Sequence, residues 1–151
     1  MEMLLLWPLL VLIRSDFRER QVSVPVLLVF GSIQWSICLA ESGTTIFAER
    51  ILENFILLAV WGMSTVVGIR WLRLGKGRTW TGWIGKGDLA FLVCLLPVFP
   101  LRFFLFFLLS SLTISLIYWL ILKESTSSTI PLVSMVGICY LPVLLFRLYG
   151  Y

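Results

Sequence analysis

The sequence predicts an all-α, polytopic membrane protein built as a bundle of about six transmembrane helices. Of its 151 residues, 60% are hydrophobic and only 13% are charged, whereas soluble domains carry about 25% charged residues. Long apolar runs alternate with short charged segments, and no polar stretch is long enough for a separate soluble domain. We therefore expect residues 1–151 to form one membrane-embedded domain.

A spanning helix needs roughly 20 mostly apolar residues. Six candidates follow one another, at about residues 3–15, 24–40, 51–71, 86–99, 101–122 and 130–149. The first is short, and spans only if its last turn includes Arg14 and approaches Asp16. The fourth is ended early by Pro97 and Pro100, so it could instead be a half-buried helix packed among the others. Pro131 begins the last helix, where its missing N–H costs nothing.

The basic residues indicate the topology. The segments around positions 14–20, 70–86 and 123 hold nine of the 12 Lys and Arg residues. They are Arg14, Arg18, Arg20, Arg70, Arg73, Lys76, Arg78, Lys86 and Lys123. Cytoplasmic loops carry the excess of Lys and Arg. We therefore expect both termini outside and positions 16 and 88 at the cytoplasmic face.

Composition also excludes several kinds of site. The chain has no His, so it cannot build a His-based zinc site, a catalytic triad or an imidazole base. Cys38, Cys94 and Cys139 each stand alone within apolar segments, which is typical of small buried side chains. The net charge of +4 lies against the membrane and attracts anionic lipid before nucleic acid. We expect no metal, no cofactor and no nucleic-acid partner.

Asp16 and Asp88 are the only Asp residues, and each lies at the edge of a long apolar stretch. Carboxylates at the margin of a bilayer are costly and tend to mark function. The first belongs to Arg14-Ser15-Asp16-Phe17-Arg18-Glu19-Arg20, and the second ends Gly85-Lys86-Gly87-Asp88. Taken alone, each motif also has a structural interpretation. The first is a positively charged helix end that sets orientation, and the second is an Asp cap at a helix start.

If the two aspartates carry function, residues beside them have supporting roles. Gly85 and Gly87 permit backbone conformations closed to other residues and let an extended substrate approach closely. Lys86 either reaches lipid phosphate or takes part in chemistry. Arg18 and Arg20 either hold lipid head groups or stabilise the nearby carboxylate. The polar stretch 73–83 is either a loop with interfacial Trp anchors or a loop that gates the second carboxylate.

Together the motifs resemble the type IV prepilin peptidase family of intramembrane aspartic proteases. That family shows an Asp followed by basic residues after its first helix, a Gly-x-Gly-Asp at a later helix start, and an Ile-Pro pair, here Ile130-Pro131, opening the last helix. The resemblance implies that Asp16 and Asp88 are the catalytic pair. It implies a prepilin-like precursor as substrate, with a basic leader and an apolar helix, cleaved at the cytoplasmic face of a prokaryotic inner membrane.

The chemistry that this family implies suits the residues present. Two nearby carboxylates do not readily both ionise, so one is held protonated while the other takes a proton from water. The chain lacks the Cys-x-x-Cys insertion of the larger members, so we expect peptidase activity without methyltransferase activity. Two departures, Val22-Ser23 in place of the usual Ile-Pro and Ala90 in place of a frequent Lys, leave the substrate's identity open.

Three alternatives remain. The chain could be a catalytically inactive membrane assembly factor. It could be a small proton-coupled transporter, because intramembrane carboxylates also mark proton relays. A presenilin-like protease also uses Gly-x-Gly-Asp, but its partner Asp follows a Tyr, whereas Asp16 follows Ser15. The sequence leaves the oligomeric state open.

Overall fold

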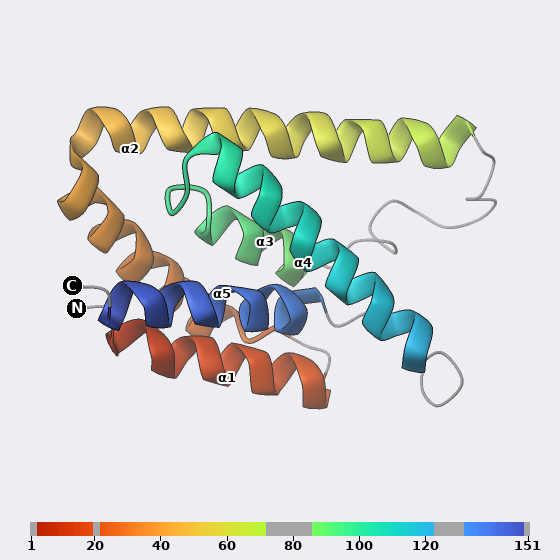
Figure 1. Cartoon of the computed structure of the whole chain (residues 1–151), viewed down its shortest axis with the longest axis horizontal. Coiled ribbons are helices and arrows are strands. Elements are labelled where there is room, and N and C mark those ends of the chain that lie inside the picture. The colour runs from red at the N-terminus through yellow and green to blue at the C-terminus, as the bar shows by residue number, and fades with distance from the viewer. Residues whose placement is uncertain (1–2, 20–21, 72–85, 123–131, 150–151) are drawn as a thin grey trace.

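The computed structural model describes residues 3–19, 22–71, 86–122 and 132–149. They form five helices, α1 (Met3–Glu19), α2 (Val24–Trp71), α3 (Lys86–Cys94), α4 (Leu101–Leu122) and α5 (Leu132–Tyr149) (Figure 1). Among these residues there is no strand. The all-α prediction is therefore confirmed for the part of the chain that the structure describes.

Three of the helices are long and apolar enough to cross a membrane. The qualifying stretches are Val24–Gly68 in α2, Leu101–Tyr118 in α4 and Leu132–Tyr149 in α5. Large apolar side chains also stay exposed on the outside of the helices, as with Phe106 (69%) and Ile121 (75%) on α4. Soluble monomers rarely leave extensive apolar patches in water. Both features are consistent with a membrane protein.

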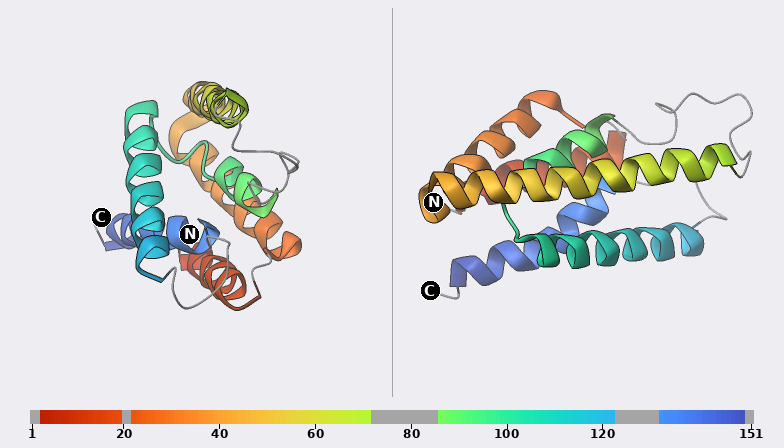
Figure 2. Two further views of the ribbon diagram at one scale, coloured as in Figure 1. Left: turned by 90° about the vertical axis from the view of Figure 1, so that its right-hand side faces the viewer. Right: turned by 90° about the horizontal axis from the view of Figure 1, so that it is seen from above.

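The prediction of about six transmembrane helices is not supported. The predicted helices 24–40 and 51–71 are the two arms of α2, and the charged connection expected between them is helical except at Gly43 (φ 73°, ψ 167°). Glu, Ala and Arg residues in that connection are good helix formers, so the helix continues through it. Gly43 alone makes the corner, since glycine adopts positive φ readily. The arms diverge from this corner (Figures 1 and 2).

Two predicted boundaries also move. Helix α1 continues past residue 15 to Glu19, so Asp16 lies inside its last turn. Helix α3 ends at Cys94 rather than at residue 99, and the residues after it form turns. That outcome matches the alternative of a short helix packed among the others, because Phe91 and the residues 95–99 are buried. The predicted helix 101–122 is confirmed as α4.

Helix α5 lies at the centre of the packing, against both α1 and α4, while α2 packs on α1 and α3. Its Tyr140 is 1% exposed and sits among three phenylalanine rings. The ring centroids of Phe30, Phe99 and Phe107 lie 6.3, 6.1 and 6.4 Å from that of Tyr140, each edge to face. Such aromatic pairs add to the stabilisation from apolar burial.

The non-helical segment after α3 lies inside the bundle, so its backbone needs partners. Asn54 on α2 is fully buried, and its Nδ2 donates to the carbonyls of Leu96 (2.7 Å) and Phe99 (2.8 Å). Trp35 Nε1 donates to the carbonyl of Cys94 (3.2 Å). An unpaired carbonyl in an apolar interior is costly. Side chains of α2 therefore stabilise the end of α3 and the non-helical segment that follows it.

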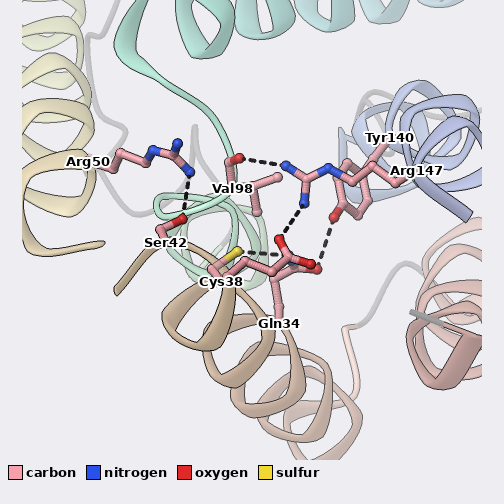
Figure 3. A network of polar contacts seen from close by, with 8 residues as sticks. Gln34, Cys38, Ser42, Arg50, Val98, Tyr140 and Arg147 are labelled. Atoms are coloured by element: carbon pink, nitrogen blue, oxygen red, sulfur yellow. Dashed lines mark hydrogen bonds and ion pairs between the residues drawn. The ribbon is translucent and has the colours of Figure 1, made fainter. Parts of the chain in front are cut away.

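A polar network joins α2, α5 and the same segment (Figure 3). Arg147 on α5 donates to the carbonyl of Val98 (3.1 Å) and pairs with Glu41 (3.9 Å). The Tyr140 hydroxyl donates to Gln34 Oε1 at 2.9 Å. The network also contains Cys38, which accepts from Gln34, and Ser42, which accepts from Arg50.

The two ends of the molecule differ. Both termini and the corner of α2 lie at one end, which we call the terminal end (Figures 1 and 2). The C-terminal end of α1 and the N-terminal ends of α3 and α5 lie together on the side away from the termini, and α2 and α4 extend beyond them; we call this side the site end (Figure 1). The arrangement thus gathers the ends of three helices, two of which carry the aspartates.

Candidate functional site

The carboxylate of Asp16 binds the start of helix α5. Asp16 is only 5% exposed, and it is the one charged residue that is buried in the described part of the chain. The backbone N–H of Ser134 donates to Asp16 Oδ2 at 2.8 Å. The Ser134 hydroxyl donates to the same oxygen at 2.7 Å and lies 3.1 Å from the carbonyl of Ile13. A hydroxyl has one proton, and the shorter of its two contacts runs to the carboxylate.

This contact satisfies a requirement of α5 itself. Ser134 is the third residue of α5, and the first four N–H groups of a helix have no partner within it. They also form the positive end of the helix dipole, which attracts a negative group. Asp16 therefore caps α5 from a different helix.

A glycine allows α1 and α5 to come this close. Gly137 lies one turn after Ser134, and a Cβ added to it would be 2.8 Å from Ile13 Cγ1 and 3.6 Å from Leu9 Cδ1. Small residues permit close helix contact in membranes. Gly137 and Ile13 meet one turn away from the Ser134–Asp16 pair, so the close approach of the two helices brings the carboxylate within reach of α5.

Asp88 lies in the first turn of α3 and is partly buried. Phe91 and Leu92, one turn further along, are 0% and 3% exposed, so this short helix is inserted into the core. The position at a helix start agrees with the sequence interpretation. Free N–H groups and the dipole of α3 favour a carboxylate there.

Gly87 of the second motif packs on Val22, in the segment that follows the first motif. A Cβ added to Gly87 would lie 2.6 Å from Val22 Cγ2 and 2.7 Å from Val22 Cβ, so its backbone packs directly on that side chain. Val22 follows Asp16 by six positions, and Gly87 immediately precedes Asp88. The chain segment that carries the second aspartate is therefore seated against the one that follows the first.

The remaining predicted residues are placed only in part. Arg18 lies in the last turn of α1 and is exposed, as a role at a lipid head group requires. Gly85 and Arg20 lie outside the described residues, and of Lys86 only the backbone is described. The proposed gating loop 73–83 and the pair Ile130-Pro131 also lie outside them.

The sequence interpretation missed Ser134. A signal was present, because Ser134 is the one Ser or Thr in the apolar run that follows Pro131. A polar residue three positions after a helix-starting proline falls in the first turn, where backbone N–H groups are free. Its partner on α1, however, is 118 residues away along the chain.

Within the described ranges, no group of three or more Cys, Asp or Glu side chains could hold a metal ion. Comparisons with models of known protein families, with curated proteins and with solved structures each find no match. The evidence for function is therefore the two motifs and the geometry at the site end.

Proposed function

We propose that this chain is an intramembrane aspartic endopeptidase that removes the leader from prepilin-like precursors. Asp16 and Asp88 activate a water molecule between them. The observation that supports the proposal is the packing of Gly87, the residue before Asp88, on Val22, which follows Asp16 by six positions. The resemblance of both motifs to the prepilin peptidase family supplies the substrate class.

The reaction is a hydrolysis and needs one acid and one base. The ionised carboxylate takes a proton from water while the protonated carboxyl donates to the oxygen of the scissile carbonyl. The water oxygen bonds to the carbonyl carbon, the C–N bond breaks, and the leaving amine takes up a proton. Both Ser134 contacts fall on Oδ2 of Asp16, so we assign Oδ1 to the water.

The charge pattern supports a cytoplasmic position for the site end. Arg14 and Arg18 are exposed on α1 beside Asp16. Because cytoplasmic segments carry the excess of basic residues, the site end faces the cytoplasm and both termini face outward. The precursor's apolar helix lies in the same bilayer, and its leader meets the aspartates at the membrane surface. Anionic lipids bind the same basic residues.

The decisive experiment uses single substitutions. Purified protein in proteoliposomes is mixed with a synthetic precursor that has a basic leader, a small residue at the junction and an apolar helix. We expect Asp16→Asn and Asp88→Asn each to lower the rate of leader cleavage by about 10²–10⁴-fold, the usual contribution of a positioned acid or base. Glu41→Gln at the terminal end is the matched control and should cleave normally. Cleavage at the wild-type rate by either Asp variant would end the proposal.

A cross-link tests proximity without activity. In a background in which Cys38, Cys94 and Cys139 are replaced by Ala, we expect cysteines at positions 16 and 88 to be joined by a short bifunctional thiol reagent. A pair at positions 16 and 41 should not be joined, because Glu41 pairs with Arg147 near the C-terminus of α5, whereas Asp16 binds its N-terminus. A folded sample in which positions 16 and 88 never link contradicts the shared water.

The alternatives make different predictions. An inactive assembly factor would keep its cellular phenotype in both Asp→Asn variants. A proton-coupled transporter would show solute uptake into proteoliposomes that depends on Asp88. In the part of α5 between Ser134 and Tyr140, Gly137 packs on apolar Ile13 and Leu9, which favours a site at one end over a proton path through the bundle.

A further inference from the structure

The two oxygens of the Asp16 carboxylate have different surroundings. Oδ2 accepts the backbone N–H of Ser134 at 2.8 Å and the hydroxyl of the same residue at 2.7 Å. Oδ1 accepts neither bond. In the described part of the chain, the buried side-chain atoms that lack a partner are Asn54 Oδ1 and Ser115 Oγ, and Oδ1 of Asp16 is not one of them. Oδ2 is therefore locked inside the bundle, while Oδ1 is the oxygen that can be reached from outside it.

We infer that Ser134 is a positioning residue, which holds the Asp16 carboxylate in the orientation that presents Oδ1 to the substrate and its water. The inference rests on the proposed peptidase function and adds a residue of the last helix to the site. The terminal torsion of an Asp side chain is broad, so an unheld carboxylate would present either oxygen. Reacting groups need to be held within about 0.5 Å and 10–20° of the productive geometry.

Ser134 is itself fixed firmly enough to set this orientation. Its side chain is 0% exposed, and its N–H belongs to the backbone of α5, which does not rotate as a side chain does. Its hydroxyl also lies 3.1 Å from the carbonyl of Ile13, three residues before Asp16 on α1. The N–H and the hydroxyl approach one oxygen as two separate donors, so together they restrain both the place and the tilt of the carboxylate.

No other residue in the described part of the chain is bonded to this carboxylate. Arg14 and Arg18, on α1 itself, are both exposed. The hydroxyl of Ser15, the nearest serine in sequence, bonds the carbonyl of Leu12 in its own helix at 3.0 Å. The orientation of Asp16 therefore depends on a single residue from a different helix, and a substitution there should disturb it without removing the carboxylate.

The test compares Ser134→Ala, Ser134→Thr and Ser111→Ala in cleavage of the synthetic precursor. Ser134→Ala removes one donor and lets the carboxylate turn. We expect kcat to fall by about tenfold or more, because a misplacement of 1 Å can cost 10²-fold. KM should stay unchanged, since the serine binds Asp16 and not the substrate. Ser134→Thr keeps the hydroxyl and should restore most of kcat. Ser111→Ala removes an equally buried hydroxyl, bonded to Leu108 in its own helix, and should change neither constant.

A serine that only stabilised the start of α5 would give a different result. Its loss would lower the thermal unfolding temperature, while the molecules that stay folded would cleave with the wild-type kcat. A wild-type kcat in Ser134→Ala therefore overturns the inference. So does a loss of kcat that Ser134→Thr does not reverse, when that variant unfolds at the wild-type temperature.

Hydrogen exchange tests the contact without cleavage. The N–H of Ser134 has no partner within α5, so its bond to Asp16 should slow its exchange with solvent. In Asp16→Ala we expect this amide to exchange at least about tenfold faster, as the loss of a buried hydrogen bond allows, and the amide of Ser111 to keep its rate. An unchanged rate at Ser134 overturns the inference. If the wild type does not cleave although the exchange responds as expected, the peptidase proposal fails and the hold of Ser134 on the carboxylate stands.

Discussion

The backbone of Gly87 rests on the side chain of Val22, and an added methyl group at Gly87 would come within 2.6 Å of Val22 Cγ2. Gly87 directly precedes Asp88, and Val22 belongs to the segment that follows the first motif. Asp88 is therefore one residue away from this contact along the chain. Neither aspartate is part of it, so its contribution can be tested without touching the carboxylates.

Gly87→Ala should therefore displace the start of α3 and reduce leader cleavage by at least about tenfold, because a shift of 1 Å in a reacting group can cost 10²-fold. The second substitution Val22→Ala removes the obstructing methyl groups and should restore part of the lost activity. Gly68→Ala on α2 is the control, since a Cβ there meets nothing within 4 Å. Normal activity of Gly87→Ala would show that this packing is not needed.

Gly137→Ala should separate α1 from α5, because the new Cβ would lie 2.8 Å from Ile13 Cγ1. Overpacking of this kind typically costs about 1–3 kcal/mol. We expect a lower thermal unfolding temperature in detergent together with weakened cleavage, since the Asp16–Ser134 contact lies one turn away. Pairing the change with Ile13→Ala should relieve the cleavage defect. If Gly137→Ala unfolds at the wild-type temperature, the close approach of the two helices is not required.

Asn54→Ala should destabilise the fold more than it affects the chemistry. Asn54 caps the carbonyls of Leu96 and Phe99, and each buried carbonyl left unpaired costs about 1–3 kcal/mol. We expect a loss of about 2–5 kcal/mol in the free energy of unfolding, measured by denaturant titration in mixed micelles. Ser64→Ala on the same arm of α2 removes an exposed hydroxyl that bonds its own helix and should change little. A small effect of Asn54→Ala would mean that water reaches the segment.

The pair of Arg147 and Glu41 should respond unequally to substitution. The ion pair is long, at 3.9 Å, and Glu41 is half exposed, so Glu41→Gln should change stability by about 1 kcal/mol or less. Arg147→Met also removes the donor to the Val98 carbonyl and should cost about 1–3 kcal/mol more. Thermal unfolding of the two variants side by side measures the difference. Equal losses would assign the stabilisation to the ion pair itself.

The sequence predicts some helices correctly and others not. The apolar run 101–122 predicted α4 correctly. About 20 consecutive apolar residues are enough to indicate a helix that crosses the bilayer, without any knowledge of the rest of the fold. The segment 41–50 misled, since its charged residues suggested a loop, although Glu41, Ala48, Glu49 and Arg50 favour a helix and Gly43 alone turns the chain. Pro97 and Pro100 correctly indicated that the fourth segment ends early, as α3 does at Cys94.

The aspartates themselves were found from local context, because a charge at the edge of an apolar run is conspicuous without any knowledge of the fold. Ser134 was not found, since a serine among apolar residues has no such contrast and is common in packed helices. Its importance depends on which side chain faces it from α1.

The amino-acid order alone determined the helical class, the apolar exterior and the two acidic motifs, because each depends on neighbours within a few turns of chain. Only the tertiary structure decided that Ser134 binds Asp16 across 118 positions, and that Gly87 meets Val22. Those contacts depend on how closely helices approach one another. That distance is set by the small residues at each crossing and by all the packing around them, which no single segment specifies.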